Sequence, residues 1–293
     1  MPTKLAKIRQ RYRRTGEAAA EQATSIDPDE QTEVEPAGTP GAAAFFDIDN
    51  TVMHGSSMFH FARGAASHGL IDGGDIARFA IAQLRFSLLG GENMDEMAEA
   101  VEAGLSFVKG RSINEIVSLG EEVFDDAISD KMWTGTISLA QKHLDAGEPV
   151  WLVSATPVEI GKILAERLGF TGALGTVAET VDGHYTGHLV GYPLHGQSKA
   201  EAVRALARRE NYILSECWAY SDSANDLPML TTVGHPVAVN PDSDLKEQAR
   251  DNSWPIYNFR GKRTAKRAGV SAAIFAGLVA AGTAAGVAAG RRR

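Results

Sequence analysis

The stretch FFDIDNT, residues 45–51, decides how the rest of the sequence is interpreted. Apolar residues run directly into two aspartates, Asp47 and Asp49, which a single isoleucine separates. A buried carboxylate without a partner costs several kcal/mol, so such groups need a cation or hydrogen bonds. These carboxylates therefore either leave a sheet at the end of a strand or bind something positive.

Buried strands alternate with helices beyond this stretch. The predicted strands are AAAFFDI (42–48), PVWLVSA (149–155), CWAYSDS (217–223) and PVAVN (236–240). The predicted helices are TISLAQKHLDA (136–146), VEIGKILAERLGF (158–170) and SKAEAVRALARREN (198–211), with Ser198 as an N-cap. The segment 177–191 alternates around Asp182–Gly183, which predicts a hairpin. This order predicts an α/β fold with a doubly wound, mostly parallel, Rossmann-like sheet.

Residues 57–130 carry helical periodicity with few strand signals. The periodic positions include Ile76, Phe79, Ala80, Gln83, Leu84, Met94, Met97, Ala98 and Val101. We therefore expect a helical cap inserted after the first strand, within a catalytic domain that covers residues 42–256.

Two terminal segments flank this domain. Residues 1–41 begin with a basic patch and continue as a polar, alanine-rich mixture, which predicts a flexible charged tail; the alternative is a basic arm that touches anionic lipid. After a basic linker at 257–268, residues 269–290 contain no charged side chain and are long enough to span a bilayer. We expect this segment to be a hydrophobic membrane-anchoring helix, with a packed helix or a disordered tail as alternatives.

The bulk composition limits the function further. The net charge is −8 and the pI about 5.5, which argues against nucleic acid as a partner. Cys217 is the single cysteine, so an intrachain disulfide is impossible and a reducing compartment is compatible. No secretory signal is apparent at the N-terminus. Together with the basic flank of the apolar segment, this predicts a cytoplasmic catalytic domain anchored to the inner face of the cell membrane.

Polar side chains follow three of the predicted strands. Asp47, Ser154 and Asp222 stand at strand ends, and Lys199 begins a helix. Ligands in such sheets bind outside the carboxyl ends of the strands, so these side chains could meet at one rim. Carboxylate oxygens suit Mg²⁺, which usually shares its ligands with substrate phosphate oxygens. Asp47 could then attack phosphorus while Asp49 acts as the general acid and base.

The same residues carry a family resemblance. DIDNT at 47–51, LVSAT at 152–156, Lys199 and SDSAND at 221–226 resemble, in order, the four motifs of the haloacid dehalogenase superfamily. The resemblance covers about residues 42–250. The helical insert after the first motif and the hairpin after the second are similar to the phosphoserine-phosphatase-like branch, subfamily IB.

The resemblance implies a role for each motif residue. Asp47 would be the nucleophile and Asp49 the general acid/base, and Asp47, Asp49 and Asp222 would bind Mg²⁺. The residues implied to bind phosphate or support its loops are Thr51, Ser154, Lys199 and Asn225. Asp226 would support the site by holding Lys199 or a metal-bound water. The presence of Asp49 points to phosphate ester hydrolysis rather than dehalogenation.

One departure from the branch bears on the substrate. Ser56 stands nine positions beyond Asp47, where phosphoserine phosphatases carry a glutamate that reads the substrate amine, and the second motif reads Ser-Ala-Thr rather than Ser-Gly-Gly. Both changes argue against phosphoserine. Possible contacts for a second anionic group are Arg63, Arg78, Arg85 and Arg111, although surface positions are the more common role. His54, His60 and His184 show no metal-ligand pattern, and we expect surface or packing roles for them.

The sequence thus predicts a Mg²⁺-dependent phosphomonoester hydrolase that forms an aspartyl-phosphate. Its substrate would be a small-molecule or lipid phosphomonoester, and its partner a membrane. Two alternatives stay open: a phosphotransferase that uses the same intermediate, and a catalytically silent scaffold on the same fold.

Overall fold

The computed structural model describes residues 4–23, 38–67, 94–105, 108–124 and 128–260. Residues up to Tyr257 belong to one compact unit. The expected segment 269–290 and residues 261–268 of the basic linker lie outside the described ranges. Within those ranges, none of the helices has both the length and the apolar character needed to cross a membrane.

A six-stranded sheet forms the centre of this unit, in the order β3-β2-β1-β6-β7-β8, with every neighbouring pair parallel. Its strands are β1 (Ala44–Asp47), β2 (Val150–Pro157), β3 (Gly172–Thr176), β6 (Trp218–Ser221), β7 (His235–Val239) and β8 (Ile256–Tyr257). The predicted α/β class and parallel sheet are confirmed. The sequence interpretation missed β3, whose GALGT sequence lacks bulky β-formers, and the two-residue β8.

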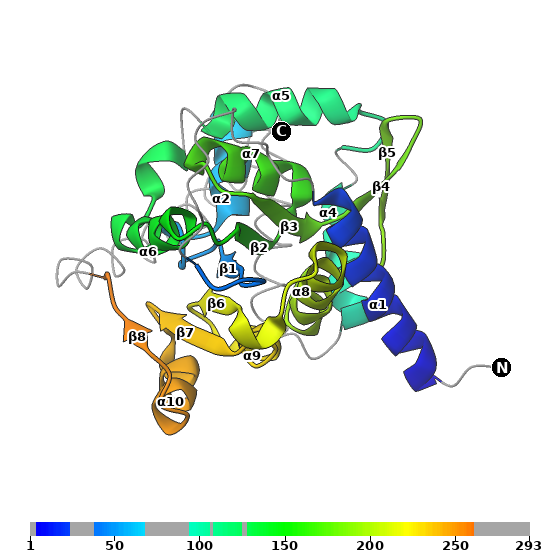
Figure 1. The fold of residues 1–293 in the computed structure, drawn as a ribbon. Helices are drawn as coiled ribbons and strands as arrows, with labels where there is room; N and C mark the ends of the chain where they lie inside the picture. Colours follow the sequence, from blue (N-terminus) through cyan, green and yellow to red (C-terminus); the bar gives the residue numbers. More distant parts are fainter. Residues whose placement is uncertain (1–3, 24–37, 68–93, 106–107, 125–127, 261–293) are drawn as a thin grey trace, which may run out of the picture. The chain divides into compact units, whose positions relative to one another are not determined.

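Helices cover both faces of the sheet (Figure 1). On one side lie α6 (Thr134–Asp145) and α7 (Val158–Leu168); on the other lie α8 (Gln197–Glu210), α9 (Leu227–Leu230) and α10 (Ser243–Asp251). Successive strand residues point to opposite faces. Phe46 therefore stacks on Tyr220 toward α6, whereas Phe45 joins the core beneath α8. Short 3-10 helices occur at Ser129–Lys131 (η2), Leu214–Glu216 (η3) and Ala224–Asp226 (η4).

Gly147 follows α6 as the predicted stop, whereas α7 ends at Leu168, two residues short of the predicted helix 158–170. Gly147 stops α6 at a φ of 76°, and Gly169 ends α7 at 68°, a region that glycine enters without penalty. The prediction of Ser198 as an N-cap is wrong. The N-cap of α8 is Gly196, and Ser198 lies inside the first turn with a fully buried side chain.

The N-terminal segment corrects a second prediction. Residues 4–22, expected to be part of a flexible tail, form helix α1 (Lys4–Gln22), which packs along α8. Small residues allow this close approach, because Ala19 and Ala20 are buried and a Cβ on Gly16 would lie 2.6 Å from the Glu201 carbonyl carbon. Composition alone suggested a solvated tail because alanine contributes little apolar surface per residue.

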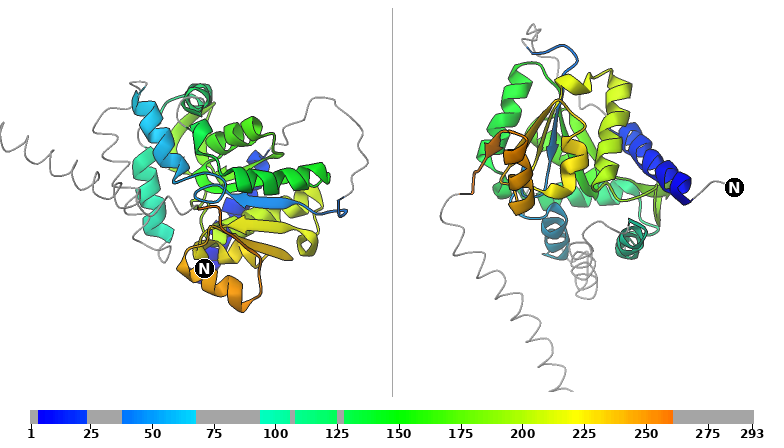
Figure 2. Two further views of the ribbon diagram at one scale, coloured as in Figure 1. Left: turned by 90° about the vertical axis from the view of Figure 1, so that its left-hand side faces the viewer. Right: turned by 90° about the horizontal axis from the view of Figure 1, so that it is seen from below.

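The described part of the cap is helical, as predicted. It contains α2 (Ser57–Ser67), α4 (Met94–Leu105) and α5 (Ile113–Val123), and α5 begins with a capping box between Ser112 and Glu115. The periodic positions between Ile76 and Leu84 lie outside the described residues. The predicted hairpin is β4 (Ala178–Val181) with β5 (His184–Leu189), joined by two positive-φ residues, as a type I′ turn requires. Helix α2 packs on α5, and α4 packs on hairpin strand β5. Figure 2 shows α2 at one end of the core.

Candidate active site

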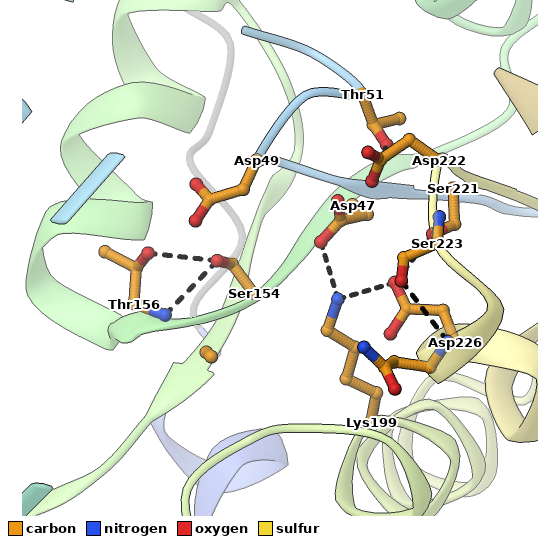
Figure 3. A network of polar contacts seen from close by, with 12 residues as sticks. Asp47, Asp49, Thr51, Ser154, Thr156, Lys199, Ser221, Asp222, Ser223 and Asp226 are labelled. Atoms are coloured by element: carbon orange, nitrogen blue, oxygen red, sulfur yellow. Dashed lines mark hydrogen bonds and ion pairs between the residues drawn. The ribbon is translucent and has the colours of Figure 1, made fainter. Parts of the chain in front are cut away.

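Three neighbouring strands end at one edge of the sheet and bring the motif residues together (Figure 3). Asp47 is the last residue of β1, Ser154 lies in the β2 segment beside it, and Asp222 directly follows β6. Lys199 reaches the same edge from the first turn of α8. The edge is formed by the carboxyl ends of parallel strands, which is where α/β sheets bind ligands.

Lys199 joins two carboxylates from different elements, Asp47 at the end of β1 and Asp226 in η4. Its Nζ donates to Asp47 Oδ1 at 2.5 Å and to Asp226 Oδ2 at 2.8 Å. Ser221 Oγ donates to the same Asp226 oxygen at 2.7 Å, which fixes the orientation of that carboxylate. Asp47 and Lys199 are 5% and 4% exposed, so their ion pair is shielded from water. Such geometry aims the ammonium at the Asp47 carboxylate.

Negative charge exceeds positive charge around Asp47. Burial raises the pKa of Asp47; Lys199 opposes this, and the neighbouring Asp226, Asp222 and Asp49 add to it. Burial also disfavours the charged form of Lys199, but Asp226 and Asp47 outweigh that effect and hold its pKa above the usual range. A bound cation would relieve the repulsion among these carboxylates and favour the ionised form of Asp47.

Asp49 belongs to a chain of hydroxyl groups on the other side of Asp47. The backbone N–H and the Oγ of Ser57 both donate to Asp49 Oδ1, at 2.8 Å and 2.5 Å. Ser57 Oγ also lies 2.6 Å from Thr156 Oγ1, and Ser154 Oγ donates to Thr156 Oγ1 at 3.0 Å. Burial raises the pKa of Asp49, against the lowering effect of the Ser57 hydrogen bonds. The carboxyl group is thereby suited to carry a proton.

Asp222 is held from behind by the first loop. Thr51 Oγ1 lies 3.4 Å from Asp222 Oδ1, and the Thr51 carbonyl accepts from Thr136 Oγ1 at 2.7 Å. The Asp222 carbonyl accepts from the backbone N–H of Asp242 at 2.7 Å. Thr51 is fully buried, so its contacts position Asp222.

A residue in the left-handed backbone conformation lets the first loop turn sharply after Asp49. Asn50 has a φ of 59°, a conformation that asparagine adopts more readily than most residues. Its side-chain oxygen accepts from the Gly55 N–H at 3.1 Å, and its carbonyl accepts from Asn240 Nδ2 at 3.3 Å. The turn leads the chain directly from the catalytic motif into α2 of the cap.

The donor set suits a hard cation. The side chains of Asp47, Asp49 and Asp222 provide only oxygen ligands. Lys199 supplies one positive charge beside four carboxylates, those three and Asp226. Among the residues that the structure describes, no group of three or more His, Cys, Asp or Glu side chains is arranged to hold a metal ion. Mg²⁺ commonly binds proteins through one or two carboxylates and keeps waters and substrate oxygens as its other ligands.

Two site residues escaped the sequence interpretation. Ser57 and Thr156 link Asp49 to Ser154, and both are buried. Thr156 is the last residue of the quoted LVSAT motif, two positions after Ser154, so strand alternation could have placed it on the same face. Ser57 follows a loop whose path no local pattern reveals.

Other predicted residues lie at the margin. Asn225 is in the η4 loop, where its backbone N–H donates to Ser223 Oγ at 3.3 Å. Arg111 and His184 lie beside α5 and the hairpin, where Tyr185 donates to the Arg111 carbonyl. Arg63 is exposed on α2. Arg78 and Arg85 lie outside the described residues.

Comparison with known proteins identifies the family. Residues 44–231 match the family model of the haloacid dehalogenase-like hydrolases. The chain is 54% identical over 229 residues to phosphoserine phosphatase SerB1 of Mycobacterium tuberculosis, which covers 78% of this chain and 74% of that protein. It is 31% identical to the histidinol-phosphatase of Neisseria meningitidis, over 74% of this chain and 98% of that one.

A solved structure agrees with these sequence matches. A Bordetella pertussis protein described as of unknown function superposes with a TM-score of 0.66 at 28% identity, over 74% of this chain and 98% of its own. Residues 44–231, which match the family model, contain all four motifs that form the site. The chain therefore belongs to the haloacid dehalogenase-like hydrolase family, as a phosphatase of that family.

Proposed function

We propose that the protein is a Mg²⁺-dependent phosphomonoester hydrolase that works through an aspartyl-phosphate on Asp47. The observation that carries this proposal is the position of Asp47. It is a buried carboxylate at the end of β1, hydrogen-bonded by Lys199 and flanked by Asp49 and Asp222. A carboxylate nucleophile needs neighbouring positive charge to approach an anionic phosphoryl group, and this site supplies it.

Each step has a residue in place. An Asp47 carboxylate oxygen forms a bond to phosphorus as the bond to the leaving alkoxide breaks, and Asp49 gives its proton to that alkoxide. Lys199 and the Ser154 hydroxyl stabilise the transferring oxygens. Asp49, now ionised, takes a proton from water, whose oxygen attacks phosphorus and releases inorganic phosphate with Asp47 restored. Burial raises the pKa of Asp49, which favours the protonated form that the first step needs.

Mg²⁺ fits the oxygen donors and the excess negative charge of the site. Carboxylate oxygens of Asp47 and Asp222 and the backbone carbonyl of Asp49 would hold it. When bound, Mg²⁺ would neutralise charge on the phosphoryl oxygens. The raised pKa of Asp47 supports this assignment, because a cation beside that carboxylate would favour its nucleophilic, ionised form.

The substrate is a small phosphomonoester whose leaving alcohol is not bound by a carboxylate at position 56. Ser56 caps the start of α2 and accepts from the Phe59 N–H at 3.4 Å, so a neutral hydroxyl stands there. Two relatives are named as a phosphoserine phosphatase and a histidinol-phosphatase. Phosphoserine and histidinol phosphate should therefore be included in any substrate panel.

A lipid phosphomonoester is a second candidate substrate. The sequence 269–290, uncharged and bordered on both sides by arginine-rich residues, supports membrane association, and a membrane-bound phosphatase would meet phosphorylated lipids. Phosphotransfer to an alcohol would use the same intermediate. Adding acceptor alcohols and comparing free phosphate with total turnover separates transfer from hydrolysis.

Phosphate release from a panel of phosphomonoesters tests the function. We expect release by the intact protein with Mg²⁺, loss of release with a chelator, and at least a thousandfold loss in Asp47→Asn, which keeps the shape of the side chain but not its nucleophilicity. Circular dichroism of the variant controls for folding. Activity retained in a folded Asp47→Asn protein would exclude the assignment.

A further inference from the structure

The two chain segments that join core and cap pair with each other beside the active site. Met53 bridges to Met132, the His54 N–H donates to the Lys131 carbonyl at 2.7 Å, and the Trp133 N–H donates to the Val52 carbonyl at 2.8 Å. One segment leaves the catalytic loop for α2, and the other returns from the cap to α6. We call this paired region the neck.

The neck gathers nitrogen-bearing side chains around His54. The His54 ring stacks on the Trp133 ring with 3.4 Å between their centroids, and His60 Nε2 lies 3.0 Å from the His54 carbonyl. Burial is the largest cause that lowers the pKa of both the His54 and the His60 ring, and the positive charge of the nearby Lys131 lowers both further. His54, His60, Lys131 and Trp133 make up the neck cluster.

Two buried polar atoms of this cluster have no hydrogen-bond partner among the described residues. Trp133 Nε1 and His60 Nδ1 are inaccessible to solvent and make no hydrogen bond in the described part of the chain. An orphaned buried group costs about 1–3 kcal/mol, so such atoms call for an explanation. Trp133 Nε1–H is a donor. His60 Nε2 faces a carbonyl and carries a proton, so Nδ1 becomes a second donor when the ring is an imidazolium.

An anion is the ligand that would satisfy both atoms once the His60 ring is protonated. A carboxylate oxygen accepts from an indole N–H and from an imidazolium, and it favours the charged form of the latter. Lys131 adds positive charge, although its Nζ is 2.5 Å from Asp130 Oδ1 on the largely exposed Asp130 side chain. Arg63 lies three residues beyond His60 on α2, and it lowers the pKa of His60, which places its charge nearby.

The neck cluster lies near Asp49, the residue that would protonate the leaving group. Ser57 donates to Asp49, the proton donor, and His60 follows Ser57 by three residues on the same helix, so the two share a face. The His60 N–H donates to the Ser56 carbonyl at 3.1 Å, which places His60 one turn beyond the position that lacks a glutamate. Nitrogen-bearing side chains thus lie one helical turn from the position at which a glutamate is absent.

We propose that the neck cluster binds a carboxylate on the leaving alcohol of the substrate, with His60 and Trp133 as its specificity-determining residues. The proposal rests on the proposed phosphatase function and names its substrate class, a phosphomonoester whose alcohol carries a carboxylate. An amine on that alcohol contributes little, because no acidic side chain stands at position 56.

Four phosphomonoesters separate these requirements. Phosphoserine carries an amine and a carboxylate, phosphoethanolamine the amine alone, 3-phosphoglycerate the carboxylate without the amine, and glycerol 3-phosphate neither. We expect kcat/KM to be at least tenfold higher with the carboxylate than without it in both pairs, and to change less than threefold with the amine. p-Nitrophenyl phosphate serves as the reference for phosphatase activity itself.

Two conservative variants assign the effect to the neck cluster. His60→Gln keeps a nitrogen in place of Nε2 but removes Nδ1, and Trp133→Phe keeps the stack on His54 but removes the N–H. We expect each to lower kcat/KM about tenfold for the two carboxylate substrates, chiefly through KM, with less than a twofold effect on the other two. His184→Gln, on the exposed hairpin, is the matched control and should change nothing.

The outcomes distinguish the two levels of the account. Hydrolysis of p-nitrophenyl phosphate with no preference for a carboxylate, or a preference that both variants retain, overturns the neck-cluster proposal and leaves the phosphatase intact. Dependence on the amine instead would also overturn it. No phosphate release from any of the five compounds by the intact protein with Mg²⁺ would overturn the proposed function and, with it, the substrate class.

Discussion

Lys199 lies between two buried carboxylates, and its loss would leave both without their shared counter-charge. Asp47 and Asp226 both accept from its ammonium, and all three side chains are almost fully buried. Removing one member of a buried ionic group is far more destabilising than replacing the group as a whole. The same lysine that would neutralise a phosphoryl group therefore also stabilises the folded, metal-free protein.

A first prediction concerns this pair. Lys199→Met should lower the free energy of unfolding by roughly 3–5 kcal/mol in chelator, because two carboxylates remain buried and uncompensated. Urea denaturation measures the change. The double variant Lys199→Met/Asp226→Asn removes one of the stranded charges and should recover part of the loss. A single variant as stable as the parent would show that the ion pair is not formed.

Asp49 yields a prediction with a pH signature. Burial raises its pKa above 3.8, so the carboxyl ionises less readily in the folded protein than in the unfolded chain. Stability contributed by the protonated carboxyl is therefore lost as the pH rises from 3.8 through the folded pKa. Asp49→Asn, which keeps an oxygen acceptor for Ser57, should raise the free energy of unfolding by of the order of 1 kcal/mol at pH 7.

This gain should shrink as the pH falls toward 3.8. Urea titrations in chelator at pH 7 and at pH 4.5 measure it, with Asp145→Asn on the distant end of α6 as the control. An increment of the same size at both pH values would mean that Asp49 is not the group responsible. Activity should fall strongly at either pH, because the variant cannot donate a proton to the leaving group.

At the scale of elements, α1 is the part of the chain most easily overlooked. The carbonyls of Ala20 and of Ala23, the residue just after α1, accept from the Arg209 guanidinium of α8. Thr15 Oγ1 accepts from the Tyr192 N–H at 2.7 Å. Arg11 donates to Asp95 of cap helix α4 at 2.8 Å and lies 4.2 Å over the Tyr192 ring. Helix α1 thus contacts the helix that bears Lys199 and also the cap.

Close packing of α1 gives a third prediction. Gly16→Leu should lower the free energy of unfolding by about 1–3 kcal/mol, because even a Cβ there would meet the backbone of Glu201. Gln10→Leu, on the exposed side of the same helix, is the matched control and should be close to neutral. Equal stability of both variants would mean that α1 does not pack on α8 as described.

At the scale of the whole molecule, the motifs were easier to predict than their supports. Strand-end aspartates can be recognised in the sequence because an apolar run that ends in carboxylates has few structural uses. Asp47, Asp222 and Lys199 lie together at the sheet edge, as expected. The roles of Ser57 and Thr156 could not be predicted because each hydroxyl hydrogen-bonds to a partner that is distant in sequence. Helix α1 escaped prediction because its packing depends on small residues fitting α8, which no periodicity reveals.

The C-terminal segment gives a prediction at the same scale. A chain truncated after Arg260 should retain phosphatase activity, because the compact unit that holds the site ends at Tyr257. It should lose any association with vesicles containing anionic lipid that the full chain shows in a flotation assay. Equal flotation of the two chains would remove the support that residues 269–290 give to a lipid substrate.

The most direct test of the central claim is to trap the intermediate. The protein with Mg²⁺ and a rapidly hydrolysed phosphomonoester is quenched in acid and reduced with borohydride, which converts a phosphorylated aspartate to homoserine, and the peptides are analysed by mass spectrometry. We expect homoserine at position 47, with none when substrate is omitted. Efficient turnover that leaves Asp47 unmodified, or that modifies Asp49 instead, would contradict the account.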